Sequence, residues 1–332
     1  MKTLAIFLEH PGLSSLTMSP AQAAALAARL GCGVRVRHCL SEREFLEALP
    51  AADWASTWTF RQEWFALAPR LRLVSTPAAG KDYFSVEWPE GVLHWNGGFH
   101  GELMGETAVA MLLGMCRGLL AAVTTFREDP WPRSQVDARM RPLRGSTVAI
   151  CGFGKIGRWA GRLLKPFGTR LLGVSLHGGH PAPDYFTPGD RCCTVEELDG
   201  LLPQADHLLL VLPRSPATDH FLDRRRLALL PPHATVTNLG RGNAIDEEAL
   251  VQALSAGRLA GACLDVCAQE PLSRESPLRQ CPNLWLTPHS SAFSPTYMDA
   301  YARELEGRLR QEGLLPSRRR SHCHAPLILT GQ

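Results

Sequence analysis

The stretch 146–164 reads STVAICGFGKIGRWAGRLL and decides the fold class of this chain. A short apolar run ends at Gly152, and Gly154 and Gly157 complete the spacing GxGxxG before a segment with helical periodicity. Glycines at this spacing permit a tight turn, let the backbone approach a pyrophosphate and let the helix pack closely on the strand. The stretch therefore predicts a strand, a dinucleotide-binding turn and a helix that receives the phosphates at its start.

Short apolar runs alternate with helical segments on both sides of this stretch. The predicted strands are bounded by polar or turn-forming residues and lie at 3–8, 34–38, 71–76, 169–175, 206–213 and 234–240. The clearest helix is 19–31, where Ser19 and Gln22 predict a capping box, Pro20 suits the first turn and Gly31 follows the end. This alternation indicates an α/β protein with parallel sheets.

The length of 332 residues exceeds what one hydrophobic core usually holds and suits two domains. A polar stretch at 127–145, with three prolines, leads into the second series of strands. Within that series, Thr194 and Glu197 predict a capping box for a helix at 194–202. We expect a doubly wound, Rossmann-type parallel sheet and a smaller, flavodoxin-like α/β domain.

Composition excludes several classes of function. With 35 basic and 32 acidic residues the net charge is +3, too little for a concentrated basic face, so no nucleic-acid partner is expected. Ten cysteines at irregular spacing predict a reducing, cytoplasmic location. The segment 107–126 is apolar, but Arg117 lies near its centre, which favours a buried or interface helix over a membrane span. His322-Cys323-His324 lacks a second ligand pair, so no metal site is expected.

The end of the second strand bears on which dinucleotide binds. A carboxylate at this position normally accepts hydrogen bonds from the adenosine ribose, but here the strand ends at Ser175 and no acid follows. A 2′-phosphate would then meet no repulsion, Ser175 could donate to it, and Arg214 adds positive charge. The cofactor is therefore NADP or NAD, with a preference for NADP expected.

Three residues in the second half supply the groups that reduction of a keto acid needs. Arg241 offers a planar cation for carboxylate and carbonyl oxygens. His289 is the natural proton carrier near neutral pH, and Glu270 can stabilise its charged form. All three follow predicted strands, at the edge where parallel sheets bind ligands.

The phrases around these residues resemble the D-isomer-specific 2-hydroxyacid dehydrogenase family. The phrases that carry the resemblance are STPAAGKD (75–82), LLLVLPRSPAT (208–218), NLGRGNAIDEEAL (238–250), AGACLDVCAQEPL (260–272) and LTPHSSA (286–292). The resemblance is dense over about 145–295 and weak before it. The phrase EPLSRESPLRQCPNLWLTPH (270–289) is similar to the glyoxylate/hydroxypyruvate reductase branch.

The resemblance implies roles for individual residues. Arg241 would bind and polarise the substrate, His289 would be the acid/base, and Glu270 would pair with it. Asp265 would hold the nicotinamide amide. The substrate carboxylate would be received at the segment Ala79, Gly80 and Lys81. Cofactor contacts are implied for Gly152, Gly154, Lys155, Ile156, Gly157, Ser175, Leu212, Pro213, Arg214, Thr218, Leu239, Gly240 and Asp265.

The family also implies the organisation of the molecule. Residues 1–99 plus 290–332 would form the substrate-binding domain and 100–289 the dinucleotide-binding domain, with substrate bound in the cleft between them. The expected activity is hydride transfer between NAD(P)H and a small 2-oxo acid, such as glyoxylate or hydroxypyruvate, to give the D-2-hydroxy acid. A homodimer is expected, with the apolar segment 107–126 at its interface and no membrane partner.

Some residues depart from the family pattern and leave alternatives open. Lys81 replaces a small aliphatic residue, and either points into solvent or favours an extra negative charge on the substrate. Phe293 and Tyr297 either line the pocket or pack at the hinge, and Thr107 stands where a histidine is common. Two other functions compete: a non-catalytic, dinucleotide-sensing module of the corepressor type, and a formate dehydrogenase relative, against which Glu270 counts.

Overall fold

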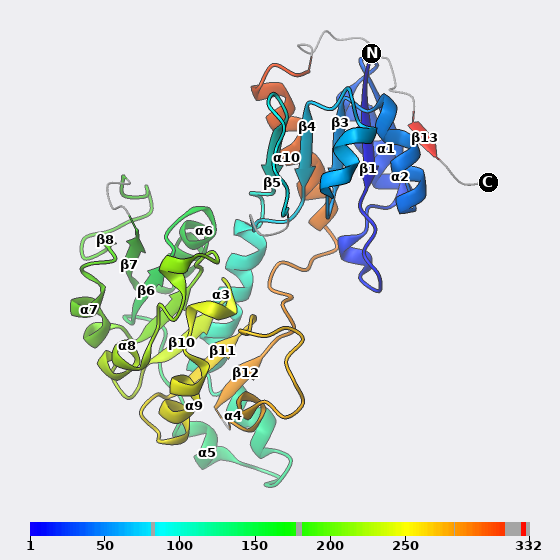
Figure 1. Ribbon diagram of the computed structural model, residues 1–332. Helices are drawn as coiled ribbons and strands as arrows, with labels where there is room; N and C mark the ends of the chain where they lie inside the picture. The colour runs from blue at the N-terminus through cyan, green and yellow to red at the C-terminus, as the bar shows by residue number, and fades with distance from the viewer. Residues whose placement is uncertain (81–83, 177–180, 282, 316–326, 330–332) are drawn as a thin grey trace. The chain divides into compact units, whose positions relative to one another are not determined.

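The structure is a computed structural model that describes residues 1–80, 84–176, 181–281, 283–315 and 327–329. The chain forms two compact units, each built around its own parallel sheet (Figure 1). Unit 1 comprises Met1–His100 and Phe293–Gln332, and unit 2 comprises Gly101–Ala292. Lys81 and the tail motif 322–324 lie outside the described residues.

Unit 1 holds a six-stranded sheet in the order β13-β2-β1-β3-β4-β5, with every described pair parallel. Its strands are β1 (Lys2–Phe7), β2 (Val34–His38), β3 (Trp54–Thr57), β4 (Leu73–Thr76), β5 (Leu93–Asn96) and β13 (Leu327–Leu329). Its α-helices are α1 (Pro20–Leu30), α2 (Glu42–Ala48) and α10 (Tyr297–Gln311). Because α10 and β13 follow unit 2 in the sequence, the last part of the chain completes the first unit.

Helix α1 begins and ends as its sequence predicts. The Ser19 side chain accepts a hydrogen bond from the Gln22 amide at 3.2 Å, and the Gln22 side chain accepts one from the Ser19 amide at 3.0 Å. Pro20 is the first helical residue, and Gly31 ends the helix with a φ of 80°. The capping box is confirmed.

Unit 2 holds a seven-stranded parallel sheet in the order β12-β11-β10-β9-β6-β7-β8. Its strands are β6 (Thr147–Cys151), β7 (Arg170–Ser175), β8 (Arg191–Thr194), β9 (His207–Leu210), β10 (Thr235–Asn238), β11 (Gly261–Leu264) and β12 (Leu284–Leu286). The chain proceeds from β6 to one edge and then returns to build outward from β9. The doubly wound sheet is confirmed, and the strand order reverses between β6 and β9, where such sheets bind ligands.

The helices of unit 2 cover both faces of this sheet. They are α3 (Gly101–Cys116), α4 (Leu119–Thr125), α5 (Arg133–Asp137), α6 (Lys155–Leu164), α7 (Leu198–Leu201), α8 (Arg224–Leu229) and α9 (Glu247–Ser255). On β6, Val148 and Ile150 join one buried cluster while Ala149 and Cys151 join another. Alternate side chains therefore enter different cores, as expected of a strand buried on both faces.

The apolar segment 107–126 is not one helix. It belongs to α3 and α4, which are bent by 63° around Gly118, a residue with a φ of 63°. Ala108 and Leu112 of α3 are fully buried in the core that α6 also borders, so burial inside unit 2 explains the apolar character of this half. Among the described residues, no single helix is long and apolar enough to cross a membrane, and only this bent pair passes that test jointly.

The helix predicted at 194–202 is shorter than expected. Residues up to Thr194 form β8, and α7 begins only at Leu198. Glu197 still accepts a hydrogen bond from the Thr194 amide at 2.8 Å, but here that contact closes the turn between strand and helix. The capping-box prediction was wrong because residues 195–197 form a turn, so α7 begins three residues too late for Thr194 to cap it.

Candidate active site

The three residues expected to perform the chemistry follow three adjacent strands of unit 2. Arg241 follows β10, Glu270 follows β11 and His289 follows β12. Because these strands are parallel neighbours, their carboxyl ends meet at the same edge of the sheet. The glycine turn follows β6 at this edge as well.

His289 and Glu270 form a direct pair. The Nδ1 atom of His289 lies 2.8 Å from Oε2 of Glu270. The other carboxylate oxygen of Glu270 accepts a hydrogen bond from the Cys267 amide at 3.0 Å, which fixes the orientation of the acid. With Nδ1 donating to the carboxylate, Nε2 is the ring atom that remains to exchange a proton with a ligand.

The loop that carries His289 is held by Asp265. Its carboxylate accepts hydrogen bonds from the Thr287 hydroxyl at 2.6 Å, the Ser290 amide at 2.8 Å and the Ser291 amide at 3.0 Å. The Asp265 carbonyl accepts the His289 amide at 2.8 Å. These contacts stabilise His289 at a φ of 51°, a conformation that non-glycine residues seldom adopt outside functional sites.

Asp265 is therefore a positioning residue for the His289 loop. Its side chain is buried, and its two oxygens accept the three hydrogen bonds given above. The predicted contact with a nicotinamide amide stays a prediction. Sequence reasoning missed Thr287, although a hydroxyl two residues before a candidate catalytic histidine could have indicated such a support.

The turn that carries Arg241 is also fixed from within. Asn238, at the end of β10, donates to the Arg241 carbonyl at 3.0 Å and accepts from the Gly240 amide at 3.0 Å. A side chain on Gly242 would lie 1.8 Å from the Cys267 carbonyl carbon, so only glycine lets this turn approach the loop after β11. The Arg241 guanidinium donates to the Gly240 carbonyl at 3.0 Å. Asn238 was not among the predicted site residues.

The three glycines of the turn after β6 differ in their surroundings. A Cβ atom on Gly152 would lie 2.4 Å from the Val211 carbonyl oxygen, and one on Gly157 would lie 2.4 Å from the Gly152 carbonyl oxygen. A Cβ atom on Gly154 would meet nothing within 4 Å. Packing inside the protein thus explains the first and third glycines, whereas the second faces open space before α6. This arrangement fits a pyrophosphate that approaches the helix start.

The remaining predicted cofactor residues lie along the same edge. Lys155 and Ile156 open α6, and Ser175 ends β7. Leu212, Pro213, Arg214 and Thr218 belong to the loop after β9, where the buried Thr218 hydroxyl donates to the Pro213 carbonyl at 2.7 Å. Leu239 and Gly240 follow β10, and a Cβ atom on Gly240 would lie 2.5 Å from the Leu212 amide nitrogen.

The segment predicted to receive the substrate carboxylate lies in unit 1, after β4. The Gly80 carbonyl accepts a hydrogen bond from the Asn96 side chain at 2.6 Å, and the Ala78 carbonyl accepts one from the Gly97 amide at 2.8 Å. Ala79 is exposed between them. Both bonds fix the loop to the end of β5.

The aromatic residues left open by the sequence differ in exposure. Tyr297 is only 4% exposed, and its hydroxyl lies 3.0 Å from His100 Nε2. Phe293 is 38% exposed. Tyr297 thus packs within unit 1, while Phe293 presents its ring at the surface of that unit.

A thiol lies close to the candidate acid/base pair but is inert. Burial raises the pKa of the Cys267 thiol to about 11, with nearby carboxylates adding to the effect. A thiol with this pKa stays protonated at neutral pH and is a poor nucleophile. Cys267 is therefore not a candidate for a covalent nucleophile at this site.

Comparison with known proteins identifies the family. The family described as D-isomer specific 2-hydroxyacid dehydrogenase, NAD binding domain, matches residues 109–291, which contain every candidate residue of unit 2. The chain belongs to this family. The resemblance stated from the sequence is confirmed, and unit 2 carries the family's NAD-binding domain.

Relatives within the family include proteins with two different names. The chain is 32% identical over 269 residues to D-3-phosphoglycerate dehydrogenase of Synechocystis. The aligned region covers 78% of this chain and 46% of the relative. It is 33% identical over 241 residues to glyoxylate/hydroxypyruvate reductase B of Pectobacterium carotovorum, which covers 71% of the chain and 74% of the relative. The chain spans about half the length of the phosphoglycerate dehydrogenases that it matches.

Solved structures share the whole fold. A D-isomer specific 2-hydroxyacid dehydrogenase family protein from Aeromonas salmonicida is 29% identical, with a TM-score of 0.74 over 95% of this chain and 97% of that one. An NADPH-dependent glyoxylate/hydroxypyruvate reductase from Sinorhizobium meliloti, solved with NADP and sulfate, is 24% identical, with a TM-score of 0.71 over 95% and 96%. Because the second protein is only 24% identical, its similarity establishes a shared fold and nothing more.

Proposed function

We propose that this protein is an NAD(P)H-dependent reductase of small 2-oxo acids that forms D-2-hydroxy acids. The observation that carries the proposal is the His289–Glu270 pair, which lies at the same sheet edge as the open glycine turn of an NAD-binding domain. The names of relatives support glyoxylate and hydroxypyruvate as the first acceptors to test.

In this proposal His289 supplies the proton. Reduced nicotinamide, when held at the glycine turn, would supply the hydride for the carbonyl carbon, and the proton on Nε2 of His289 would go to the carbonyl oxygen. One 2-oxo acid, one hydride and one proton thus give one 2-hydroxy acid. Glu270 holds Nδ1 at 2.8 Å, keeps the ring oriented and stabilises the charged imidazolium before transfer.

Arg241 provides the positive charge for the substrate. A guanidinium can hold carboxylate and carbonyl oxygens together, which orients the acceptor and draws electron density from its carbonyl carbon. The hydrogen bonds of Asn238 and the tight approach at Gly242 fix the turn that presents this side chain. Fixed donors lower the reorganisation needed in the transition state.

The two units have different proposed roles. Unit 2 corresponds to the proposed dinucleotide-binding domain at 100–289, and unit 1 to the proposed substrate-binding domain at 1–99 plus 290–332. The carboxylate of the substrate would bind the segment at Ala79 and Gly80. The hydrogen bond from Asn96 to the Gly80 carbonyl supports this role because it holds the loop in one conformation.

The experiment that tests the function follows the absorbance of reduced nicotinamide. Purified protein is given NADPH or NADH with glyoxylate, hydroxypyruvate, pyruvate or phenylpyruvate, and His289→Ala serves as the control. We expect turnover with at least one acceptor and a loss of about 100-fold or more in kcat in the variant. Tight cofactor binding without turnover on any acceptor would contradict the proposal and favour the dinucleotide-sensing module.

We also propose that the protein is a homodimer. The chain from α4 to residue 131 exposes Leu119, Val123, Phe126 and Trp131, with Trp131 70% exposed. A hollow of about 830 Å³ beside these residues is lined by Ala122, Val136 and Met140, among others. Contiguous exposed apolar surface of this kind favours association, so a second copy is the proposed occupant. The proposed interface is therefore α4 and the segment up to residue 131, in place of the whole segment 107–126.

A cytoplasmic location is the remaining proposal about the whole protein. It is supported by the irregular spacing of the ten cysteines, which suits a reducing compartment. Fractionation of the native cell with an antibody to the protein tests it.

A further inference from the structure

Three cations after the glycine turn share one face: Arg158 and Arg162 on α6, and Lys165 directly after its end. This spacing places their side chains on the same side of the helix. Two of them pair with acids of the facing segment 181–190. Arg162 donates to both oxygens of Asp184 at 2.9 and 3.0 Å, and Lys165 lies 2.7 Å from Asp190.

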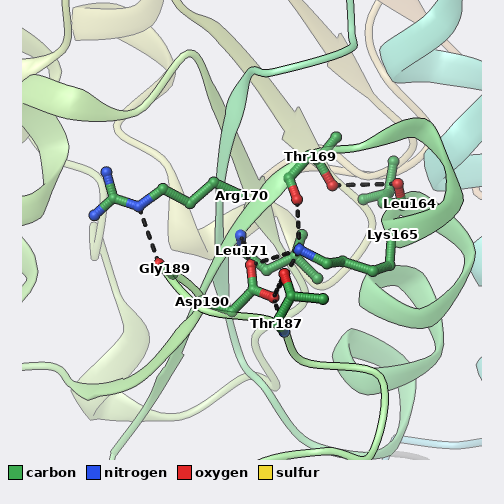
Figure 2. Close-up of polar contacts among 8 residues, drawn as sticks. All are labelled: Leu164, Lys165, Thr169, Arg170, Leu171, Thr187, Gly189 and Asp190. Atoms are coloured by element: carbon green, nitrogen blue, oxygen red, sulfur yellow. Dashed lines mark hydrogen bonds and ion pairs between the residues drawn. The ribbon is translucent and has the colours of Figure 1, made fainter.

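The pair at the far end of this face is a buried anchor (Figure 2). The Asp190 carboxylate, 1% exposed, accepts the Leu171 amide at 2.8 Å and the Thr187 amide at 2.6 Å. Lys165 also donates to the Thr169 carbonyl at 2.8 Å. These bonds tie the end of the segment 181–190 to β7 and to the turn that directly follows α6.

Arg158 differs from Arg162 and Lys165 in its partners. Among the described residues its guanidinium donates to the Pro181 carbonyl at 3.1 Å and lies 5.3 Å from the centre of the Phe153 ring, but it pairs with no carboxylate. The Arg158 carbonyl accepts the Tyr185 hydroxyl at 2.6 Å, so its backbone is held as well. Of the three, Arg158 is the one for which the described residues supply no carboxylate, and it directly follows Gly157.

Arg158 lies close to the position where the adenosine end of a dinucleotide would bind. Phe153, under its guanidinium, stands between the first two glycines and packs against Gly173 of β7, where a Cβ atom would lie 2.4 Å from the ring. Pro181 lies six residues beyond Ser175, the end of β7. The adenosine ribose of a dinucleotide binds at the end of this second strand.

The charge at this place suits an anion. The sequence from Ser175 to Pro181 contains no acid, and the nearest described acids of the facing segment, Asp184 and Asp190, are neutralised by Arg162 and Lys165. A guanidinium has five N–H donors, of which the Pro181 carbonyl accepts one from Arg158. The remaining donors can hold phosphate oxygens in a bidentate manner.

We propose that Arg158 binds the 2′-phosphate of NADP and is the residue that selects NADP over NAD. The inference deepens the proposed function, since it rests on a dinucleotide being bound at the glycine turn, but it requires no particular substrate. Ser175 and Arg214 were the sequence candidates for this preference, and the structure adds Arg158. Arg158 lies on α6, whereas Ser175 ends β7 and Arg214 lies in the loop after β9.

The test measures binding by calorimetry with two adenosine fragments, adenosine 2′,5′-bisphosphate and 5′-AMP. They differ only in the 2′-phosphate. We expect wild type to bind the bisphosphate at least about 10-fold more tightly than 5′-AMP. Arg158→Gln should weaken the bisphosphate about 10- to 100-fold and leave 5′-AMP within about 2-fold, while Arg158→Lys should retain part of the preference.

Arg162→Gln is the matched control, because Arg162 lies one turn further along the same face and is already paired with Asp184. It should leave the affinity ratio of the two fragments unchanged. Equal affinities in wild type, equal losses for both fragments in Arg158→Gln, or the same effect in Arg162→Gln would each overturn the proposal. The fragments contain no nicotinamide and no oxo acid is present, so the binding result does not depend on the proposed reductase activity. That activity is tested separately, by the turnover assay with intact cofactor.

Discussion

At the scale of single residues, the candidate active site depends on groups that support other groups. Glu270 orients His289 at 2.8 Å, and Asp265 holds the loop in which His289 adopts a φ of 51°. Neither acid needs to meet the substrate in order to affect the reaction. Their contributions can be separated by substitutions that keep shape and remove charge.

Glu270→Gln removes the negative charge beside His289 and keeps the size of the side chain. We expect kcat for oxo acid reduction to fall about 10- to 1000-fold, because a neutral amide no longer stabilises the imidazolium that donates the proton. Steady-state kinetics across pH 5 to 9 measures this. A variant with unchanged kcat and an unchanged pH profile would rule out a role for the pair.

The glycines of the turn after β6 allow a second prediction. Gly154→Ala places a methyl group in open space and should leave the melting temperature unchanged while weakening the cofactor about 10-fold or more. Gly157→Ala places a methyl group 2.4 Å from the Gly152 carbonyl oxygen and should cost about 2 kcal/mol of stability. Thermal unfolding and cofactor titration of both variants provide the comparison. Equal destabilisation by the two would contradict the proposed division of roles.

At the scale of elements, buried polar groups join the strands of unit 2 to their neighbours. His207, at the start of β9, lies 2.8 Å from the Thr235 hydroxyl of β10 and 3.4 Å from the Cys116 sulfur at the end of α3. Burial lowers the pKa of His207 to about 4, so the folded protein holds it neutral. The histidine thus links three elements without carrying charge at neutral pH.

This neutral histidine predicts how stability depends on pH. Above pH 6.5 His207 is neutral in both folded and unfolded chains, so it adds no dependence. Between pH 6.5 and about 4 His207 is protonated in the unfolded chain but stays neutral in the folded chain. The free energy of unfolding therefore falls by about 3 kcal/mol as the pH decreases over this range. Chemical denaturation from pH 7.5 to 4 measures the slope, and His207→Gln should flatten it. An equally steep slope in the variant would assign the effect to other groups.

At the scale of the whole molecule, the proposed dimer concerns exposed apolar surface after α3. Trp131→Asp introduces charge where a second copy would exclude water, so we expect a mass near that of one chain in sedimentation at micromolar concentration, against twice that mass for wild type. Leu67→Asp, which changes a 43% exposed leucine in unit 1, serves as a surface control. Wild type that sediments as a monomer would contradict the proposed dimer.

Much of this molecule was predictable because its signals are local. The strand-turn-helix stretch at 146–164 contains its own turn glycines, and helix 19–31 contains both of its end signals. Residues such as Arg241, Glu270 and His289 stand directly after apolar runs, and parallel strands bring such ends to one edge. For these features the sequence by itself determined the fold class, the family and the candidate chemistry.

Other features were decided only by tertiary contacts. Thr194 became part of β8 through its pairing with β7, and the helix after it begins only at Leu198. The apolar segment is divided into α3 and α4, and it is α3 whose residues join the core of unit 2. Arg158 differs from Arg162 only through its partners, and those partners come from a segment some twenty residues away. Burial, strand pairing and charge compensation depend on residues that are distant in the sequence but adjacent in the fold, and no local sequence pattern specifies these neighbours.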